Sequence, residues 1–112
     1  MPWYPFNSGK NIGQRGSEGG TIIHDLEHSN GARISLEQNG DIAPFAITCG
    51  IYGWMFHTRF FGNESEAELD FVQMQRGIEK ILEITLLFDN SEANSRRQEV
   101  YQAISSFVDE FP

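Results

Sequence analysis

The sequence predicts an α+β protein with a four-stranded antiparallel sheet of two hairpins and two C-terminal helices packed on one face, a two-layer sandwich. Between residues 21 and 62, short stretches rich in β-branched and aromatic residues are separated by turns that contain glycine and asparagine. From residue 65 to 111, apolar residues recur at helical spacing instead. These patterns match each other, because an apolar sheet face needs amphipathic helices to cover it.

Composition limits the class of protein. The chain has 112 residues, enough for one domain over residues 1–112 with a modest core. A net charge of −8 argues against nucleic-acid binding, which requires a basic surface. The N-terminus lacks the pattern of a signal peptide, and no apolar run approaches the length of a membrane span. We therefore expect a cytoplasmic protein that contacts neither membrane nor nucleic acid.

Residues 1–20 are predicted to be irregular, because five glycines punctuate them. The aromatic residues Trp3, Tyr4 and Phe6 are expected to pack as a lid on the edge of the core. A phosphate-cradling loop is the functional alternative. The run matches neither GxxxxGK[ST] nor GxGxxG, however, and no predicted strand precedes it.

Residues 21–38 are predicted to form a hairpin with the loop Ser29-Asn30-Gly31, in which Gly31 adopts the left-handed conformation. This register places Glu27 opposite Arg33, a favourable pair of charges. It also separates two faces. One is mainly apolar and carries His24, Leu26, His28, Ala32, Ile34 and Leu36; the other is polar and carries Asp25, Glu27, Arg33, Ser35 and Glu37.

Residues 46–61 are too long for one straight strand, since sixteen extended residues would span roughly 53 Å. We expect a second hairpin with the loop Gly50–Gly53, which pairs Cys49 with Trp54 and Ile47 with Phe56. A bulge within one bent strand is the alternative. In either arrangement Trp54, Phe56 and Phe60 face the core, and Met55, His57 and Arg59 face outward with Thr48. Among the aromatic residues, Tyr52 and Phe61 are the predicted exceptions that reach the surface.

The first helix is predicted to begin after Gly62, with Ser65 and Glu68 as a capping box. Gly77 interrupts its apolar stripe and is expected to allow close approach to the sheet. A second capping box at Ser95 and Gln98 begins the second helix, after a turn over residues 89–94. The first stripe is Ala67, Phe71, Met74, Ile78, Ile81, Leu82 and Phe88; the second is Val100, Tyr101, Ile104, Phe107, Val108 and Phe111.

Two patterns resemble reactive sites. His24 to His28 matches H-x-x-E-H, a zinc motif that needs both histidines one turn apart on a helix. In the predicted strand they lie roughly 13 Å apart, so they cannot share one zinc. Cys49 is interpreted as a small buried residue, because the predicted alternation puts His57 on the other face. His24 shares the face of Cys49 and stays open as its partner, since the order of the strands is not known. We expect neither a metal site nor a cofactor.

The polar face of the sheet is the candidate site. It is predicted to combine Asp25, Glu27 and Arg33 with His57 and Arg59, groups that can transfer protons or hold a polar ligand. A solvated surface of paired charges is the competing interpretation.

Two functions remain from the sequence. The favoured one is a small acidic binding protein, inhibitor-, immunity- or regulatory-like, that contacts a partner protein or a second copy of itself through the open sheet face or the helix pair. The alternative is a small-molecule-binding domain or enzyme in which His57 acts with Asp25 or Glu27 as acid and base. Both hypotheses place Glu27 and His57 on the same side of the sheet.

Overall fold

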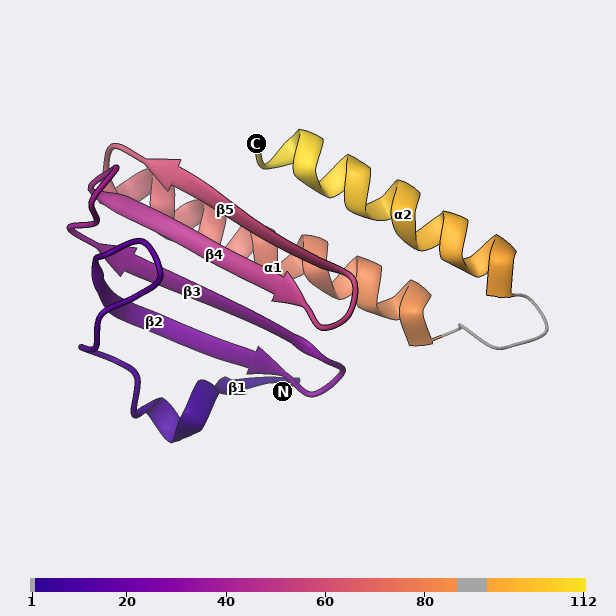
Figure 1. The fold of residues 1–112 in the computed structure, drawn as a ribbon, viewed down its shortest axis with the longest axis horizontal. Helices are drawn as coiled ribbons and strands as arrows, with labels where there is room; N and C mark the ends of the chain where they lie inside the picture. The colour runs from indigo at the N-terminus through magenta and orange to yellow at the C-terminus, as the bar shows by residue number, and fades with distance from the viewer. Residues whose placement is uncertain (1, 87–92) are drawn as a thin grey trace.

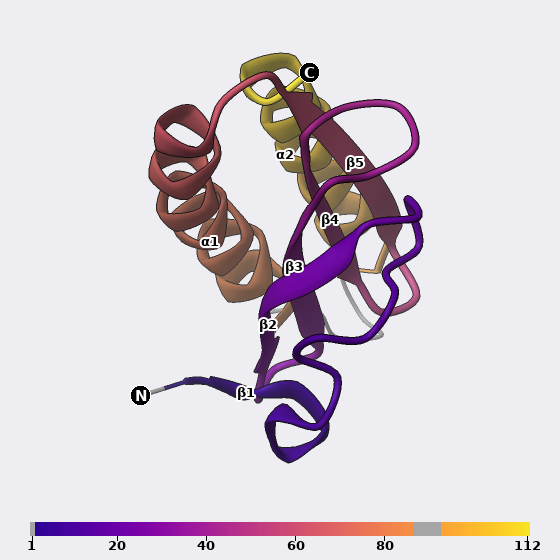
Figure 2. The same cartoon turned by 90° about the vertical axis from the view of Figure 1, so that its left-hand side faces the viewer.

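The computed structural model describes residues 2–86 and 93–112, which form a five-stranded antiparallel sheet with two helices (Figure 1). The strands follow one another along the sheet in sequence order. α1 packs on one face of the sheet, against β3 and β4, and α2 lies next to α1 along β5 (Figure 2). The predicted α+β class is therefore confirmed, with five strands rather than four. The elements are β1 Trp3–Pro5, η1 Phe6–Gly9, β2 Thr21–His28, β3 Ala32–Gln38, β4 Phe45–Ile51, β5 Met55–Phe61, α1 Glu64–Leu86 and α2 Ala93–Glu110.

The additional strand is β1, in the segment predicted to be irregular. Trp3 pairs with His28, and Pro5 ends the strand opposite Leu26. The Trp3 ring meets the His28 ring edge-on at 4.8 Å, and its Nε1–H donates to Glu79 Oε1 of α1 at 3.2 Å. A three-residue strand gives no periodic signal in the sequence, so only these contacts reveal it.

The predicted hairpin of β2 and β3 is confirmed in its loop and in its register between the loop and His24. His28 pairs with Ala32, Glu27 with Arg33 and Asp25 with Ser35. Gly31 has φ +105°, and its N–H donates to the His28 carbonyl at 3.0 Å. One irregularity near the start of β2 brings Ile22 opposite Glu37.

The second hairpin exists, but its predicted register is wrong. β4 continues through Gly50 and Ile51, because both residues pair with β3. The loop is therefore Tyr52-Gly53-Trp54, closed by a hydrogen bond from Trp54 N–H to the Ile51 carbonyl at 2.9 Å. Cys49 consequently pairs with His57 instead of Trp54.

This displacement is three residues, an odd number, so every side chain of β5 lies on the face opposite to the predicted one. Met55, His57 and Arg59 face the helices. Phe56 and Phe60 face outward and are 87 % and 40 % exposed. Phe61, predicted to reach the surface, is buried, whereas Tyr52 is exposed as expected.

The core lies between the sheet and the helices. Each large aliphatic side chain there contributes about 1.5–3 kcal/mol by leaving water. Gly77 allows close approach to α2 rather than to the sheet, since a Cβ there would lie 2.8 Å from Phe107 Cδ2. The largest fully buried aliphatic side chains are Ile34, Leu36, Ile47 and Ile51 of the sheet, Ile78, Ile81 and Leu82 of α1, and Val100 of α2.

The predicted helix starts need correction. α1 begins at Glu64, and Asn63 caps it by accepting a hydrogen bond from Glu66 N–H at 2.9 Å. Ser65 therefore lies inside the helix. α2 begins at Ala93, which also places Ser95 within it. The predicted burial of Phe88 and most of the predicted turn lie outside the described residues.

Candidate functional site: a groove on the open sheet face

The strand register arranges the open face in cross-strand rows. One row reads Glu27, Arg33, Gly50, Phe56, and a second reads Asp25, Ser35, Thr48, Thr58. The predicted grouping of Asp25, Glu27 and Arg33 with Ser35, Glu37 and Thr48 is therefore found. Of this group, Arg33, Ser35 and Thr48 line the groove described below.

His57 and Arg59 do not belong to this group, because they lie on the helix side of the sheet. His57 Nε2 bonds the Phe111 carbonyl, which requires the proton to be on Nε2. Arg59 Nη1 lies 3.3 Å from Asp70 Oδ2 and donates to the Glu110 carbonyl at 3.3 Å. The expected pairing of His57 with Asp25 or Glu27 is not formed, since the sheet separates them.

Arg33 is held in one orientation. Its Nε and Nη2 donate to the two carboxylate oxygens of Asp25 at 2.9 and 2.8 Å, and the Asp25 side chain is fully buried. The Phe6 ring lies over the guanidinium at 3.7 Å, a cation–π contact. Asp25 raises the pKa of Arg33 by accepting these hydrogen bonds, although burial acts in the opposite direction. The guanidinium is thus a fixed, permanently charged group.

Glu27 is bound by two tyrosines. Tyr52 Oη–H donates to Oε2 at 2.6 Å, and Tyr4 Oη–H donates to Oε1 at 3.2 Å. Burial, followed by the hydrogen bond to Glu27, raises the pKa of Tyr52 to about 12. Tyr52 therefore remains a neutral donor at ordinary pH, and Glu27 is engaged rather than available as a base.

The glycine-rich segment does cradle an anion, but that anion is the protein's own Glu37. The Glu37 side chain is almost fully buried, and Oε1 accepts hydrogen bonds from Gly20 N–H at 2.8 Å and Glu18 N–H at 3.1 Å. A Cβ at Gly16 would lie 2.4 Å from Glu37 Oε2, so a glycine is needed there. The predicted alternative of a phosphate loop thus has its anion site occupied by Glu37.

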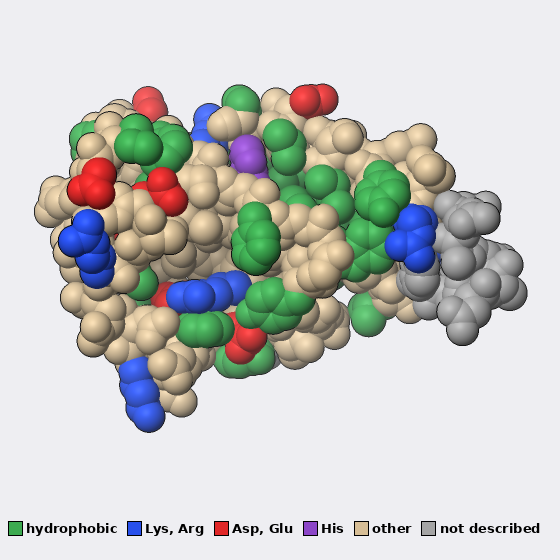
Figure 3. All heavy atoms as spheres, in the orientation of Figure 1, with side chains coloured by type: hydrophobic (Ala, Val, Ile, Leu, Met, Phe, Trp, Pro, Cys, Tyr) green, Lys and Arg blue, Asp and Glu red, His purple; other side chains and the backbone are tan. Residues whose placement is uncertain are grey.

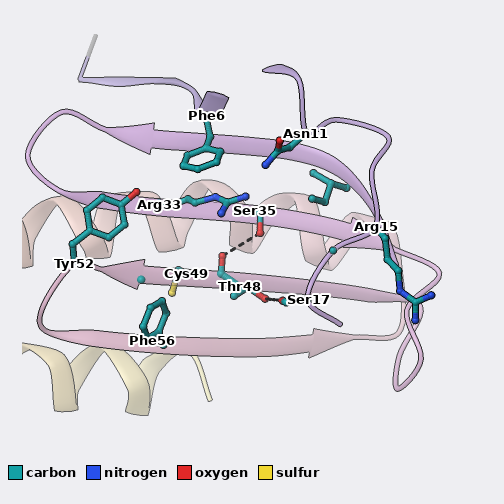
Figure 4. Close-up of a pocket in the computed structure, with 13 residues that line it drawn as sticks. Phe6, Asn11, Arg15, Ser17, Arg33, Ser35, Thr48, Cys49, Tyr52 and Phe56 are labelled. Carbon is teal, nitrogen blue, oxygen red and sulfur yellow. Dashed lines mark hydrogen bonds between the residues drawn. The ribbon is translucent and has the colours of Figure 1, made fainter. Parts of the chain in front are cut away.

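A groove of about 610 Å³ lies on this face, between the N-terminal segment and β5. Ser35 and Thr48 lie on its floor, and Phe6 and Phe56 stand on opposite sides (Figure 4). Gly50 also lines it, next to Arg33 in the cross-strand row. Tyr52 lies at one end (Figure 4). Arg15 and Ser17 lie toward the other end (Figure 4). The volume is in the range of small-molecule sites.

Three aromatic side chains project beside the groove, and we name them the aromatic row: Tyr52, Phe56 and Phe60. They are 48 %, 87 % and 40 % exposed. Figure 3 shows hydrophobic side chains on this surface. The Phe56 ring leans over Gly50, where a Cβ would meet it at 3.0 Å. The pairing of Phe56 with a glycine is the sequence signal that could have identified the row, since an aromatic ring often covers a glycine across a strand pair.

The cysteine and the other two histidines are buried or paired with neighbouring groups. Burial raises the pKa of the Cys49 thiol to about 12, so it is not a nucleophile even though His57 is its cross-strand partner. His24 pairs with Glu68 at 3.0 Å, and His28 Nδ1 accepts a hydrogen bond from Asn30 N–H at 3.0 Å. Within residues 2–86 and 93–112, no three His, Cys, Asp or Glu side chains lie close enough together to hold a metal.

No known protein family matches this chain, and searches of curated proteins and of solved structures also found no match. Of the two helices in the described residues, neither has the length and apolar composition needed to cross a membrane.

Proposed function

We propose that this protein is a non-catalytic interaction protein that docks a basic partner protein on the aromatic row. The observation that supports this is Phe56, a phenylalanine 87 % exposed at the centre of the row. Exposed aromatic side chains grouped on one surface are typical of interface centres. Phe56 is also supported by Gly50 beneath its ring, so it presents a pre-oriented apolar anchor.

The structure does not bring together the groups that the acid–base alternative requires. His57 and Glu27 lie on opposite faces of the sheet, and no proton can pass directly between them. Asp25 is bound to Arg33, and Glu27 is bound to two tyrosines. The interaction proposal therefore relies on the aromatic row in place of His57 and Arg59.

The charge of the chain indicates the character of the partner. A net charge of −8 produces a negative potential that attracts a basic protein over distances beyond direct contact. We expect a partner of net basic charge with an apolar pocket for Phe56.

A photoreactive benzoylphenylalanine at position 56 or 60, introduced in the cells that produce the protein, tests the proposal. The control is the same residue at position 69, where Leu69 is 61 % exposed on α1. We expect one discrete heterologous adduct from positions 56 and 60 and none from 69. Binding of the purified partner should weaken about tenfold or more in Phe56→Ser and should be unchanged in Leu69→Ser.

Added salt should slow association with that partner, because steering between opposite charges is screened. Equal labelling from position 69, or no adduct from 56 and 60, would overturn the proposal. An adduct with twice the mass of the chain would identify a second copy as the occupant and would likewise refute a basic partner.

A further inference from the structure

We propose that the groove beside the aromatic row binds a small organic anion with a flat apolar body, such as an aromatic carboxylate or sulfonate. This is a binding activity in addition to protein docking, and Tyr52 and Phe56 of the aromatic row also line the groove. It follows from three properties of the groove: its hydroxyl-bearing floor, the sign of its charged side chains and its aromatic walls.

The hydroxyl groups of the floor are weakly bonded to one another. Thr48 Oγ1 lies 3.5 Å from Ser17 Oγ and 3.4 Å from Thr58 Oγ1, and Ser35 Oγ–H donates to the Thr48 carbonyl at 3.5 Å (Figure 4). Hydrogen bonds between hydroxyl groups are usually close to 2.8 Å. The floor therefore offers donors that an acceptor-bearing ligand would bind more closely.

The charged side chains that line the groove in the described residues are both arginines, Arg15 and Arg33. Each is paired with an aspartate that does not line the groove: Arg33 with the buried Asp25, and the exposed Arg15 with Asp41 at 3.7 Å. Arg33 uses Nε and Nη2 for Asp25, and no bond is formed by its Nη1 within the described residues. Because Asp25 and the Phe6 ring fix the guanidinium, binding through Nη1 costs little further ordering.

The carboxylates of the open face do not line the groove, so they do not oppose the binding of an anion there. Asp25 is bound to Arg33, Glu27 to two tyrosines and Glu37 to the glycine-rich loop. Their acceptor oxygens are already engaged, whereas donors remain in the groove. A ligand with acceptor oxygens therefore fits this set of groups better than a cation.

The walls favour a flat ligand body. Phe6 and Phe56 stand on opposite sides of the floor, and Tyr52 lies at one end (Figure 4). Gly50 leaves the floor without a side chain between Arg33 and Phe56. Aromatic rings prefer stacked or edge-on contacts with other rings, so a planar body matches this space.

The test uses two probes that share the same rings. 1-Anilinonaphthalene-8-sulfonate carries the anion, and N-phenyl-1-naphthylamine lacks it. Titration by fluorescence, with amide shifts recorded by NMR, should show saturable binding of the sulfonate at one site. The largest shifts should fall on Ser35, Thr48 and Gly50, and the neutral probe should bind about tenfold or more weakly.

Matched variants separate the groove from other surfaces. Thr48→Val removes the central hydroxyl, and Thr85→Val makes the same change on α1, away from the groove lining. Arg15→Gln removes an exposed charge of the groove, and Arg76→Gln removes one on α1. We expect Thr48→Val and Arg15→Gln to weaken sulfonate binding about fivefold or more, and the two controls to leave it unchanged.

Equal affinity for the two probes, or shifts confined to the cavity between α1 and α2 near Arg76, would overturn the proposal. Phe60→Ser keeps this test separate from the protein-docking proposal, because Phe60 does not line the groove. If Phe60→Ser abolishes partner binding and leaves sulfonate binding intact, both proposals stand. If sulfonate binding fails while partner binding persists, only the ligand proposal fails.

Discussion

Replacing Glu37 with glutamine tests how the glycine-rich segment is held. Glu37 is 1 % exposed, and its carboxylate accepts hydrogen bonds from the N–H groups of Gly20 and Glu18. A hydrogen bond to a charged group contributes about 1.5–3 kcal/mol to stability. In Glu37→Gln one carbonyl oxygen remains as a neutral acceptor, while the new NH₂ group adds donors where N–H groups already converge.

We therefore expect Glu37→Gln to lower the free energy of unfolding by about 2–3 kcal/mol. At an unfolding entropy of about 2.1 cal/mol/K per residue, the 112 residues give about 0.24 kcal/mol/K. The melting temperature should then fall by about 10 °C. The matched control is Glu27→Gln, because that carboxylate is half-buried and is bound by tyrosine hydroxyls at the surface. It should cost less than about 1 kcal/mol.

Urea unfolding followed by circular dichroism measures both variants, and hydrogen exchange locates the effect. The Gly20 amide should lose protection in Glu37→Gln and keep it in Glu27→Gln. Gly16→Ala should cost a similar amount, because its Cβ would lie 2.4 Å from Oε2, and the double variant should lose less than the sum. If the two glutamine variants lose the same free energy of unfolding and the Gly20 amide stays protected, Glu37 does not hold the glycine-rich segment in place.

Three further predictions concern the helices, the histidines and the turn. Gly77→Ala gains about 1 kcal/mol of helix propensity, but the new Cβ clashes with Phe107. We therefore expect urea unfolding to show a net decrease of about 1 kcal/mol in the free energy of unfolding. The decrease should be smaller in the background of Phe107→Leu, where the side chain at 107 is smaller. Burial lowers the pKa of His28 below 6.5, so the folded state resists protonation and stability should fall as the pH drops from about 6.5 through the folded pKa. Urea unfolding at pH 8 and pH 5 should show a larger loss for the wild type than for His28→Asn; equal losses would contradict this. Gly53→Ala should destabilise by about 1 kcal/mol, because Gly53 has φ +82°, and the control Gly62→Ala, where a Cβ meets open space, should not.

Local signals were sufficient for the first hairpin. Gly31 fixes a three-residue loop, and the opposite charges of Glu27 and Arg33 agree with the apolar alternation on the other face. Each signal independently selects the same register, and the predicted pairs from His28–Ala32 to His24–Leu36 are found. The predicted pair of Ile23 with Glu37 is wrong, because a bulge before His24 puts Ile22 there instead. The helical stripe of α1 was identified for the same reason, with Met74 and Ile78 fully buried at the predicted positions.

The second hairpin shows where such signals conflict. Gly50 and Gly53 are both plausible turn residues, and alternation in β5 was interpreted from its bulkiest side chains. Bulk does not indicate burial here, because Phe56 is the most exposed large hydrophobic residue among those described. The position of the turn depends on β3, because β3 pairs with Gly50 and Ile51 and keeps both residues in β4.

The sequence by itself determined the α+β class, the loop of the first hairpin and the grouping of Asp25, Glu27 and Arg33, because each depends on contacts between residues near in the chain or on a repeating pattern. Tertiary structure alone decided the face of His57, the cradle around Glu37 and the groove beside Phe56. Each of these depends on which distant segment a strand or loop meets, and that is set by the packing of the whole chain and by no local pattern.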